Sequence, residues 1–354
     1  MSMRASIIRT YGVRALGSML LGLSPQLGQA TQNFEVYVTN EKSGDVTVIN
    51  GSDNKVLTTI ALGKRPRGIH ASPDGKTIYV ALTGTPIAGP PSARKTEDVA
   101  AGPQADKSAD AIGILDVAKK RLTRRIAAGS DPEEFSLSAD GTKLYVSNED
   151  VKTASVIDIA SGKVEHVVPV GEEPEGVATT PDGKRFYVTC EAGGEIEVVE
   201  TARYAVVGHF NVNARPRSVA FLPGSAIGYI PSELTGELNV IDTTKLKVLK
   251  VVTLPQGSRP MSVKVALDGK RIYVSNGRAG TVSVLDSQTY DLLTTIPVGV
   301  RPWGMALSPD GAFLYTANGP SNDVSVVDLK TNKEIARVGA GTSPWSVAVV
   351  PVAH

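Results

Sequence analysis

The side chains most able to bind a ligand or to take part in a reaction flank a proline that recurs at seven places along the chain. Those that are arginine, glutamate or tryptophan include Arg65, Arg67, Glu133, Glu175, Arg215, Arg217, Arg259, Arg301, Trp303 and Trp345. Arginine offers paired N–H donors to an anion, and tryptophan offers a flat stacking surface. These residues therefore predict a ring that binds a partner protein, or a small ligand with an anionic or planar part. The alternative is that neighbouring opposite charges pair with one another around the rim.

Three further polar residues, His70, Glu134 and Lys264, follow a proline by two or four places, where the other units mostly have Gly, Ser or Ala. A polar side chain among packed strands must find a partner or reach water. These residues are candidate catalytic groups facing a channel, or structural residues satisfied singly by the backbone. For His70 the structural interpretation is favoured, because a lone histidine is a poor signature of an enzyme.

A metal ion is the next chemistry to consider, because Glu134, Glu149 and Glu191 come from neighbouring units. Hard cations such as Ca²⁺ take oxygen ligands of this kind. However, no Asp-x-Asp-x-Asp-Gly loop occurs and the histidines are scattered, so a solvated acidic rim is the favoured interpretation. We expect no cofactor, with a divalent cation at these carboxylates as the alternative.

Composition and motifs exclude several other classes of protein. The formal net charge of +1 provides no basic field for nucleic acid. The single cysteine, Cys190, excludes an internal disulfide, and no Cys-x-x-Cys-His segment could attach haem. Beyond residue 30 the chain contains no Gly-x-Ser-x-Gly elbow and no phosphate-binding loop.

The elements that must position these residues are repeats of about 42 residues. The repeat is marked by tyrosines at Tyr37, Tyr79, Tyr145, Tyr187, Tyr229, Tyr273 and Tyr315. It is marked again by the prolines Pro66, Pro132, Pro174, Pro216, Pro260, Pro302 and Pro344. Each unit has four short apolar runs separated by turn residues, which predicts an all-β, seven-bladed β-propeller with four antiparallel strands per blade.

The two ends of the repeat region predict how the ring closes. The chain begins on a second strand at Val36–Val38 and ends on a lone first strand at Ser346–Val349. Pairing these strands completes one blade and removes the exposed edges. An insertion of 24 residues between Tyr79 and Asp116, at about 83–109, is predicted to be a long loop on the same face as the prolines. This loop is either a lid over the ring or a surface loop without a function.

The first 30 residues have the pattern of an export signal. Arg4, Arg9 and Arg14 precede a short apolar run, and the small residues Gly28 and Ala30 flank a plausible cleavage point. We therefore expect a signal peptide at 1–30, a propeller domain at 31–354, and a periplasmic or secreted location. No apolar run is long enough to span a bilayer, and a monomer is expected.

The segments Tyr37-Val38-Thr39-Asn40 and Tyr273-Val274-Ser275-Asn276 resemble the motif of the YVTN β-propeller repeat proteins. The resemblance covers residues 34–351. Segments such as Arg301-Pro302-Trp303-Gly304 are similar to a periplasmic subgroup linked to PQQ (quinone)-dependent alcohol catabolism, which would imply an accessory role.

Without a catalytic constellation in the sequence, the leading interpretation is a non-enzymatic binding or scaffold propeller that uses the Arg- and Trp-bearing ring. One alternative is a metal-dependent lactonase or hydrolase at the acidic side of the ring, with His70 relaying a proton. A further alternative is an accessory that docks a quinoprotein or cytochrome.

Overall fold

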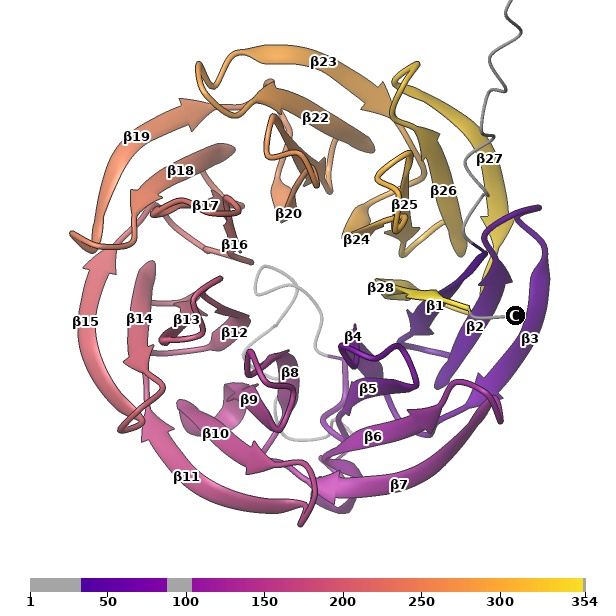
Figure 1. The fold of residues 1–354 in the computed structure, drawn as a ribbon, viewed down its shortest axis with the longest axis vertical. Helices are drawn as coiled ribbons and strands as arrows, with labels where there is room; N and C mark the ends of the chain where they lie inside the picture. The colour runs from indigo at the N-terminus through magenta and orange to yellow at the C-terminus, as the bar shows by residue number, and fades with distance from the viewer. Residues whose placement is uncertain (1–32, 88–103, 353–354) are drawn as a thin grey trace, which may run out of the picture. The chain divides into compact units, whose positions relative to one another are not determined.

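The computed structural model describes residues 33–87 and 104–352, and in them seven four-stranded antiparallel sheets surround a central axis (Figure 1). The chain divides into two units, Met1–Thr31 and Gln32–His354, and all of the described structure belongs to the second. The predicted seven-bladed β-propeller is confirmed. The predicted signal peptide at 1–30 lies outside the described residues.

The blades are numbered here in chain order, each from its innermost strand outward. Blade 1 contains β28 (Pro344–Pro351), β1 (Phe34–Asn40), β2 (Asp45–Asn50) and β3 (Val56–Ala61). Blade 2 contains β4 (Pro66–Ala71), β5 (Thr77–Leu82), β6 (Ala111–Asp116) and β7 (Arg121–Ala127). Blade 3 contains β8 (Pro132–Leu137), β9 (Lys143–Asn148), β10 (Thr153–Asp158) and β11 (Lys163–Pro169). Blade 4 contains β12 (Pro174–Thr179), β13 (Arg185–Cys190), β14 (Glu195–Glu200) and β15 (Ala205–Asn211).

Blade 5 contains β16 (Ala220–Phe221), β17 (Ile227–Ser232), β18 (Glu237–Asp242) and β19 (Lys247–Thr253). Blade 6 contains β20 (Pro260–Val265), β21 (Arg271–Asn276), β22 (Thr281–Asp286) and β23 (Leu292–Pro297). Blade 7 contains β24 (Pro302–Leu307), β25 (Phe313–Asn318), β26 (Asp323–Asp328) and β27 (Lys333–Gly339). The helices in the described residues are single 3-10 turns at Lys107–Ala109 and Glu149–Val151.

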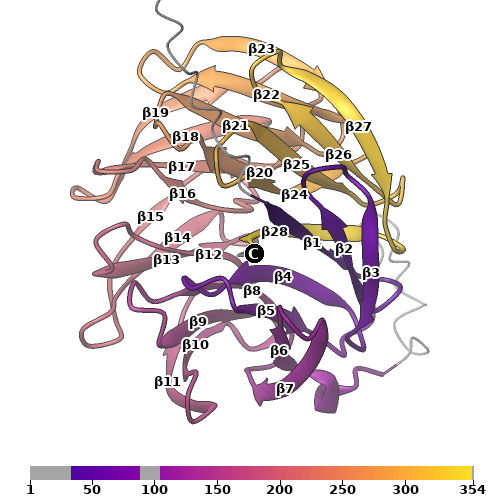
Figure 2. The same cartoon turned by 45° about the vertical axis from the view of Figure 1, so that its right-hand side comes forward.

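The ring closes where the two ends of the repeat region meet. β1 pairs with β28 in antiparallel register, with Val36 opposite Val349 and Val38 opposite Val347. This is the pairing that the sequence predicted, and it leaves no inner or second strand without a neighbour. Figure 2 shows β28 beside β1, although the two strands lie at opposite ends of the chain.

The recurring tyrosines lie between neighbouring blades and supply much of the core. Tyr37, Tyr187, Tyr229 and Tyr315 are fully buried, and each packs among β-branched residues. A fully buried aromatic side chain of this size removes a large apolar area from water. The tyrosine repeat is therefore a packing signal, which explains why it marks the architecture so clearly.

The two residues that end the motif have separate structural roles. The amide of Asn148 donates to the hydroxyls of Thr153 (3.1 Å) and Ser155 (2.9 Å), which ties the second strand to the third. The hydroxyl before it, on Ser147, crosses to the next blade and donates to the carbonyl of Glu175 at 2.6 Å. Equivalent bonds join Thr39 to Arg67 (2.7 Å) and Ser275 to Trp303 (2.8 Å). The motif thus anchors the residues that follow the prolines.

The loops of the propeller sort onto two faces. The proline loops and the turns between second and third strands share one face, called here the proline face. The turns between first and second strands, and between third and fourth, share the opposite face, called the turn face, which Figure 1 views. The insertion lies between β5 and β6 and therefore leaves from the proline face. Its residues 88–103 lie outside the described part of the chain.

Candidate functional site

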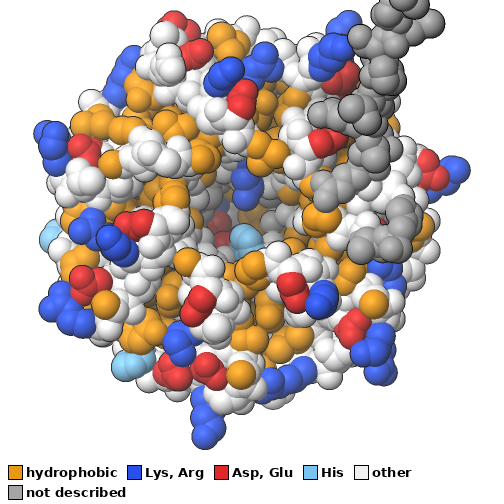
Figure 3. Space-filling model, viewed as in Figure 1, with side chains coloured by type: hydrophobic (Ala, Val, Ile, Leu, Met, Phe, Trp, Pro, Cys, Tyr) orange, Lys and Arg blue, Asp and Glu red, His pale blue; other side chains and the backbone are white. Residues whose placement is uncertain are grey.

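A cavity of about 560 Å³ occupies the centre of the ring. Its walls are the inner strands of the blades, from Ile69 in blade 2 to Val349 in blade 1. Figure 3 shows a hollow at this point on the turn face, with histidine, basic and acidic side chains visible inside it. The candidate catalytic residues His70, Glu134 and Lys264 all line this cavity, although they come from blades 2, 3 and 6.

His70 and Glu134 form a hydrogen-bonded pair between adjacent inner strands. The Nε2 atom of His70 lies 2.8 Å from Oε1 of Glu134, and the two side chains are 34% and 19% exposed. The same carboxylate oxygen accepts the backbone N–H of Phe135 at 2.9 Å, and the Phe135 ring meets the imidazole edge-on at 4.9 Å. The imidazole is therefore held on two sides while part of it remains open to water.

The glycine two places before His70 makes room for this pair. A Cβ atom on Gly68 would lie 2.5 Å from Oε1 of Glu134, closer than atoms can approach. The absence of a side chain at Gly68 therefore allows the carboxylate to reach the imidazole.

Lys264 is the unpaired cation of the cavity. No acidic side chain of the described residues forms an ion pair with it, and burial lowers the pKa of its ammonium group, an effect that the negative charge of Glu134 opposes. An amine in such a position can donate to a developing negative charge. The structure thus brings together three residues that the sequence marked singly: a proton acceptor, a carboxylate that orients it, and a donor.

The end of the cavity toward the proline face is formed by the two tryptophans. The rings of Trp303 and Trp345 lie 5.4 Å apart at 55° to each other. The Arg217 guanidinium lies 5.8 Å from the centre of the Trp303 ring, and that of Arg67 lies 5.6 Å from Trp345. This pair of rings, called here the tryptophan floor, lies between the cavity and most of the charged residues around the prolines, although Glu175 and Arg217 also line the cavity.

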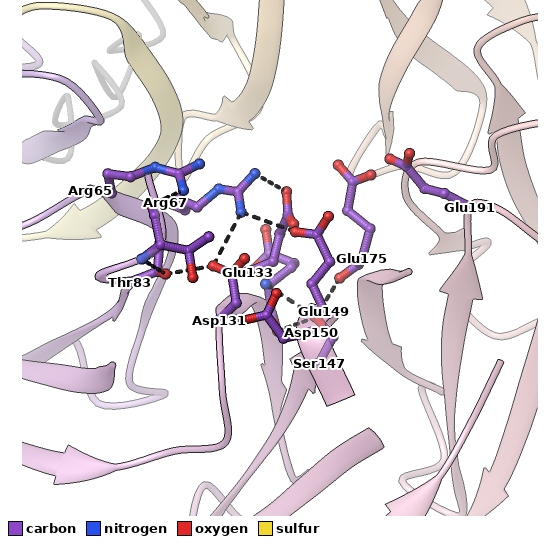
Figure 4. Close-up of polar contacts among 12 residues, drawn as sticks. Arg65, Arg67, Thr83, Asp131, Glu133, Ser147, Glu149, Asp150, Glu175 and Glu191 are labelled. Carbon is purple, nitrogen blue, oxygen red and sulfur yellow. Dashed lines mark hydrogen bonds and ion pairs between the residues drawn. The ribbon is translucent and has the colours of Figure 1, made fainter. Parts of the chain in front are cut away.

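Arg67 is the centre of the first buried charge cluster behind the floor (Figure 4). Its guanidinium pairs with Glu133, lies 3.5 Å from Glu149, and lies 3.7 Å from Glu41. Its neighbour Arg65 pairs with Glu41 at 2.8 Å. Because these carboxylates come from blades 1 and 3, Arg67 joins three blades.

Arg217 is the centre of a second cluster of the same kind. It pairs with Glu175 and Glu191 of blade 4 and lies 2.7 Å from Glu233 of its own blade. Arg215 donates to Glu191 at 2.7 Å. For Arg65, Arg67, Arg215 and Arg217 the structure therefore shows the charge pairing that the sequence left as an alternative to ligand binding, with partners that are mostly buried.

Arg259 and Arg301 differ from these four arginines. Neither has an ion pair with an acidic residue of the described chain, and the Arg301 guanidinium lies 5.1 Å from the centre of the Trp303 ring. Burial and the like charges of Arg217 and Arg215 lower the pKa of Arg301, an effect that Glu233 opposes. Both arginines precede a proline and therefore lie on the proline face, outside the lining of the cavity.

The carboxylates suggested as metal ligands are not brought together. Glu134 pairs with His70, Glu149 with Arg67, and Glu191 with Arg215 and Arg217. In residues 33–87 and 104–352, no group of three histidine, cysteine or acidic side chains is placed to hold a metal ion. The carboxylates present thus do not fit the suggested site.

Two members of the charge clusters were missed from the sequence. Glu41 and Glu233 are the first residues after a second strand, the position that Glu149 and Glu191 occupy in their blades. A comparison of this one position across the repeats would have found them.

The charge clusters predict how stability depends on pH. Burial raises the pKa of Asp131 and Glu191, and it raises that of Glu133 well above its usual range. A carboxyl group whose pKa is higher in the folded than in the unfolded state contributes to stability. This contribution is complete below about pH 4 and is lost as the pH rises through the folded-state pKa. We expect the thermal unfolding midpoint to fall as the pH rises above about 4, and to fall less in Glu133→Gln.

The control for this measurement is Glu172→Gln. Glu172 is exposed, pairs with Lys152, and has a lowered pKa. Its substitution should leave the pH profile parallel to that of the wild type. A Glu133→Gln profile that is also parallel would contradict the assignment.

The fold and the cavity define a seven-bladed propeller with a polar central site. Residues 30–178 and 201–349 match the family described as "Lactonase, 7-bladed beta-propeller", and the chain belongs to this family. No curated protein sequence matches the chain.

Solved structures show the same fold at low sequence identity. A "putative 6-phosphogluconolactonase" from Bacteroides uniformis is 18% identical, with a TM-score of 0.73 over 90% of this chain and 100% of that one. A protein described in the same words from Bacteroides fragilis is 17% identical, with a TM-score of 0.72 over 91% and 99%. Hydrazine synthase of Kuenenia stuttgartiensis is 22% identical, with a TM-score of 0.67 over 80% and 89%.

These matches correct the function predicted from the sequence. The non-enzymatic binding or scaffold interpretation is wrong, because the chain belongs to a lactonase family and resembles lactonase-like structures. The matches favour the lactonase alternative instead. The error arose because the catalytic candidates lie on different blades, so no short motif contains them. Within the described residues, no helix is long and apolar enough to cross a membrane.

Proposed function

We propose that this protein is a lactone hydrolase whose reaction takes place in the central cavity. The observation that carries the proposal is the His70–Glu134 pair, held at 2.8 Å inside a cavity that Lys264 also lines. Membership of the lactonase family supports the same reaction.

The geometry of the pair suggests how water is activated. With the Nε2–H of His70 donated to Glu134, the Nδ1 atom is left as an acceptor. His70 then takes a proton from a water molecule as the water oxygen attacks the lactone carbonyl. Glu134 fixes the orientation of the ring and stabilises the imidazolium that forms.

The remaining steps use Lys264 and the same histidine. The ammonium group of Lys264 donates to the oxyanion of the tetrahedral intermediate. The ring oxygen then leaves with the proton held by His70, and the product is a hydroxy acid. No step is assigned to a metal ion, because Glu149 and Glu191 are already paired with arginines.

The experiment that tests the proposal is proton release by the purified protein in the presence of simple lactones. We expect hydrolysis of at least one of δ-gluconolactone, its 6-phosphate and dihydrocoumarin, and no loss of activity on treatment with a chelator. Absence of hydrolysis of all three would overturn the proposal. Loss of activity on chelation would overturn the assignment of the steps to side chains alone.

Lys264→Met should separate activity from stability. We expect turnover to fall by about 10²–10³-fold, the usual effect of removing one oxyanion donor. We expect the folded state to become more stable by about 1 kcal/mol or more, because an unpaired buried charge is replaced by an apolar side chain of similar length. Steady-state kinetics and urea unfolding measure the two effects.

The pH dependence of the stability gain provides a check on its origin. The folded-state pKa of Lys264 lies below its ordinary value of 10.5, so its contribution to stability is complete above that value and is lost as the pH falls through the folded pKa. The gain in Lys264→Met should therefore be largest at a pH where Lys264 is charged in the folded state, and it should vanish above about pH 10.5. Lys247→Met, at an exposed site on β19, should change neither quantity.

We also propose that the enzyme acts outside the cytoplasm as a monomer. The arginine-bearing, acid-free first 30 residues support export, and the resemblance to the YVTN repeat proteins of the quinone-linked periplasmic subgroup supports a periplasmic location. The mass of the chain recovered from a periplasmic fraction tests this, since an uncleaved cytoplasmic chain would contradict it.

A further inference from the structure

We propose that the cavity selects an uncharged lactone bearing an aromatic ring, which packs on the tryptophan floor, and that it rejects phosphorylated lactones. This inference rests on the proposed function and specifies its substrate class.

The surfaces of the cavity favour an apolar, flat ligand. The floor presents the Trp303 and Trp345 rings, and Met261 lies beside them. The apolar walls above the floor include Ile69, Leu137, Val177, Val263, Met305 and Leu307. Aromatic rings prefer tilted or offset neighbours, and the 55° angle between the two indoles offers both edge and face contacts to a third ring.

The charges that line the cavity offer no counterion for a phosphate group. They are Glu134, Glu175, Arg217 and Lys264, which is two of each sign. Arg217 is already paired with three carboxylates. Lys264 faces the charge of Glu134 and is needed for the oxyanion.

The charged residues behind the floor are also mostly paired with one another. The two charge clusters contain seven carboxyl groups, Glu41, Asp131, Glu133, Glu149, Glu175, Glu191 and Glu233, and four arginines, Arg65, Arg67, Arg215 and Arg217. The four arginines of the clusters are thus already paired, and the two arginines of this face without ion pairs, Arg259 and Arg301, lie outside the lining of the cavity.

Two hydrogen-bonding groups on the cavity wall have no partner in the described chain. They are the indole N–H of Trp345, a residue only 7% exposed, and the hydroxyl of Ser218. Both residues line the cavity. A buried donor without an acceptor is costly, so a small rotation of the Trp345 ring that brings its N–H to a ligand oxygen at the floor would be favoured.

The tryptophans provide a binding signal that is independent of turnover. The protein contains only two tryptophans, and both form the floor. In His70→Gln, whose turnover should be strongly reduced, dihydrocoumarin should change the intrinsic fluorescence with saturation. The 6-phosphate of δ-gluconolactone should not.

Turnover by the wild type provides the second measurement. The value of kcat/KM for dihydrocoumarin should exceed that for the phosphorylated lactone by about 100-fold or more. Trp345→Phe should raise KM for dihydrocoumarin several-fold with little change in kcat, because the smaller ring loses contact area with the ligand and the indole N–H is removed. Trp303→Phe should raise KM as well. Tyr290→Phe, an aromatic substitution outside the lining of the cavity, is the matched control and should change KM little.

The outcomes distinguish the two proposals. Preference for the phosphorylated lactone, or a fluorescence response to it equal to that of dihydrocoumarin, would overturn the substrate class and leave the hydrolase intact. Saturable binding of dihydrocoumarin without hydrolysis of any lactone would overturn the hydrolase and leave the ligand class.

Discussion

Replacement of His70 by Gln is expected to reduce lactone turnover by about 10²–10⁴-fold, the range over which a positioned general base contributes. Glutamine can still donate a hydrogen bond to Glu134, so the pair of side chains and the cavity should persist. What is lost is a group that accepts a proton from water and returns it to the leaving oxygen. The measurement is kcat on the best lactone of the panel, together with thermal unfolding to show that the fold is retained.

Two further variants make this prediction specific. His209→Gln removes an exposed histidine on the outer strand β15 and should leave turnover unchanged. Glu134→Gln retains a hydrogen-bond acceptor but removes the charge that stabilises the imidazolium, so its turnover should also fall substantially. Retention of most activity in His70→Gln would contradict the assignment of His70 as the base and would require another residue in that role.

The architecture could be predicted from the sequence because each repeat carries local signals that act within one blade. Asp74 accepts the hydroxyl of Ser72 at 2.6 Å and the backbone N–H of Lys76 at 3.1 Å, and Gly75 adopts a φ of 68°. These bonds close the turn between the first and second strands without help from the rest of the fold. Ring closure could be predicted as well, because β1 and β28 belong to two incomplete repeats that together make one complete blade.

The candidate site was predicted as individual residues and not as an arrangement. His70 and Glu134 are 64 positions apart, and their contact depends on the twist and spacing of two blades and on the space left by Gly68. For the same reason the partners of the arginines could not be predicted. Charge signs around the prolines were visible in the sequence, but whether Arg217 faces a ligand or Glu175 depends on side-chain directions that spacing does not specify.

The burial of the charge clusters was the second feature that the sequence did not predict. Exposed pairs were expected around a rim, yet the side chains of Arg67 and Glu133 are only 9% and 3% exposed. At that depth the charges act on the stability of the ring far more than a surface pair does, because removal of one partner leaves the others without a counterion.

Replacement of Arg67 by Met is therefore expected to destabilise the protein by about 3–5 kcal/mol, the usual result of removing one partner from a buried ionic cluster. The loss leaves Glu133, Glu149 and Asp131 without the charge that Arg67 supplies, and it removes a link among three blades. Urea unfolding measures the change in the free energy of unfolding.

A matched surface variant and a double variant show whether burial is the cause. Arg337 forms comparable ion pairs with Glu334 and Asp323 at a side chain that is 44% exposed, so Arg337→Met should cost less than about 1 kcal/mol. Addition of Glu133→Gln to Arg67→Met should restore part of the lost stability, because one stranded carboxylate is removed. Equal costs for Arg67→Met and Arg337→Met would show instead that the clusters behave as solvated pairs. In that case the pairs that occupy Arg217 would be solvated and easily exchanged, and the argument that Arg217 is unavailable to a phosphorylated substrate would weaken with it.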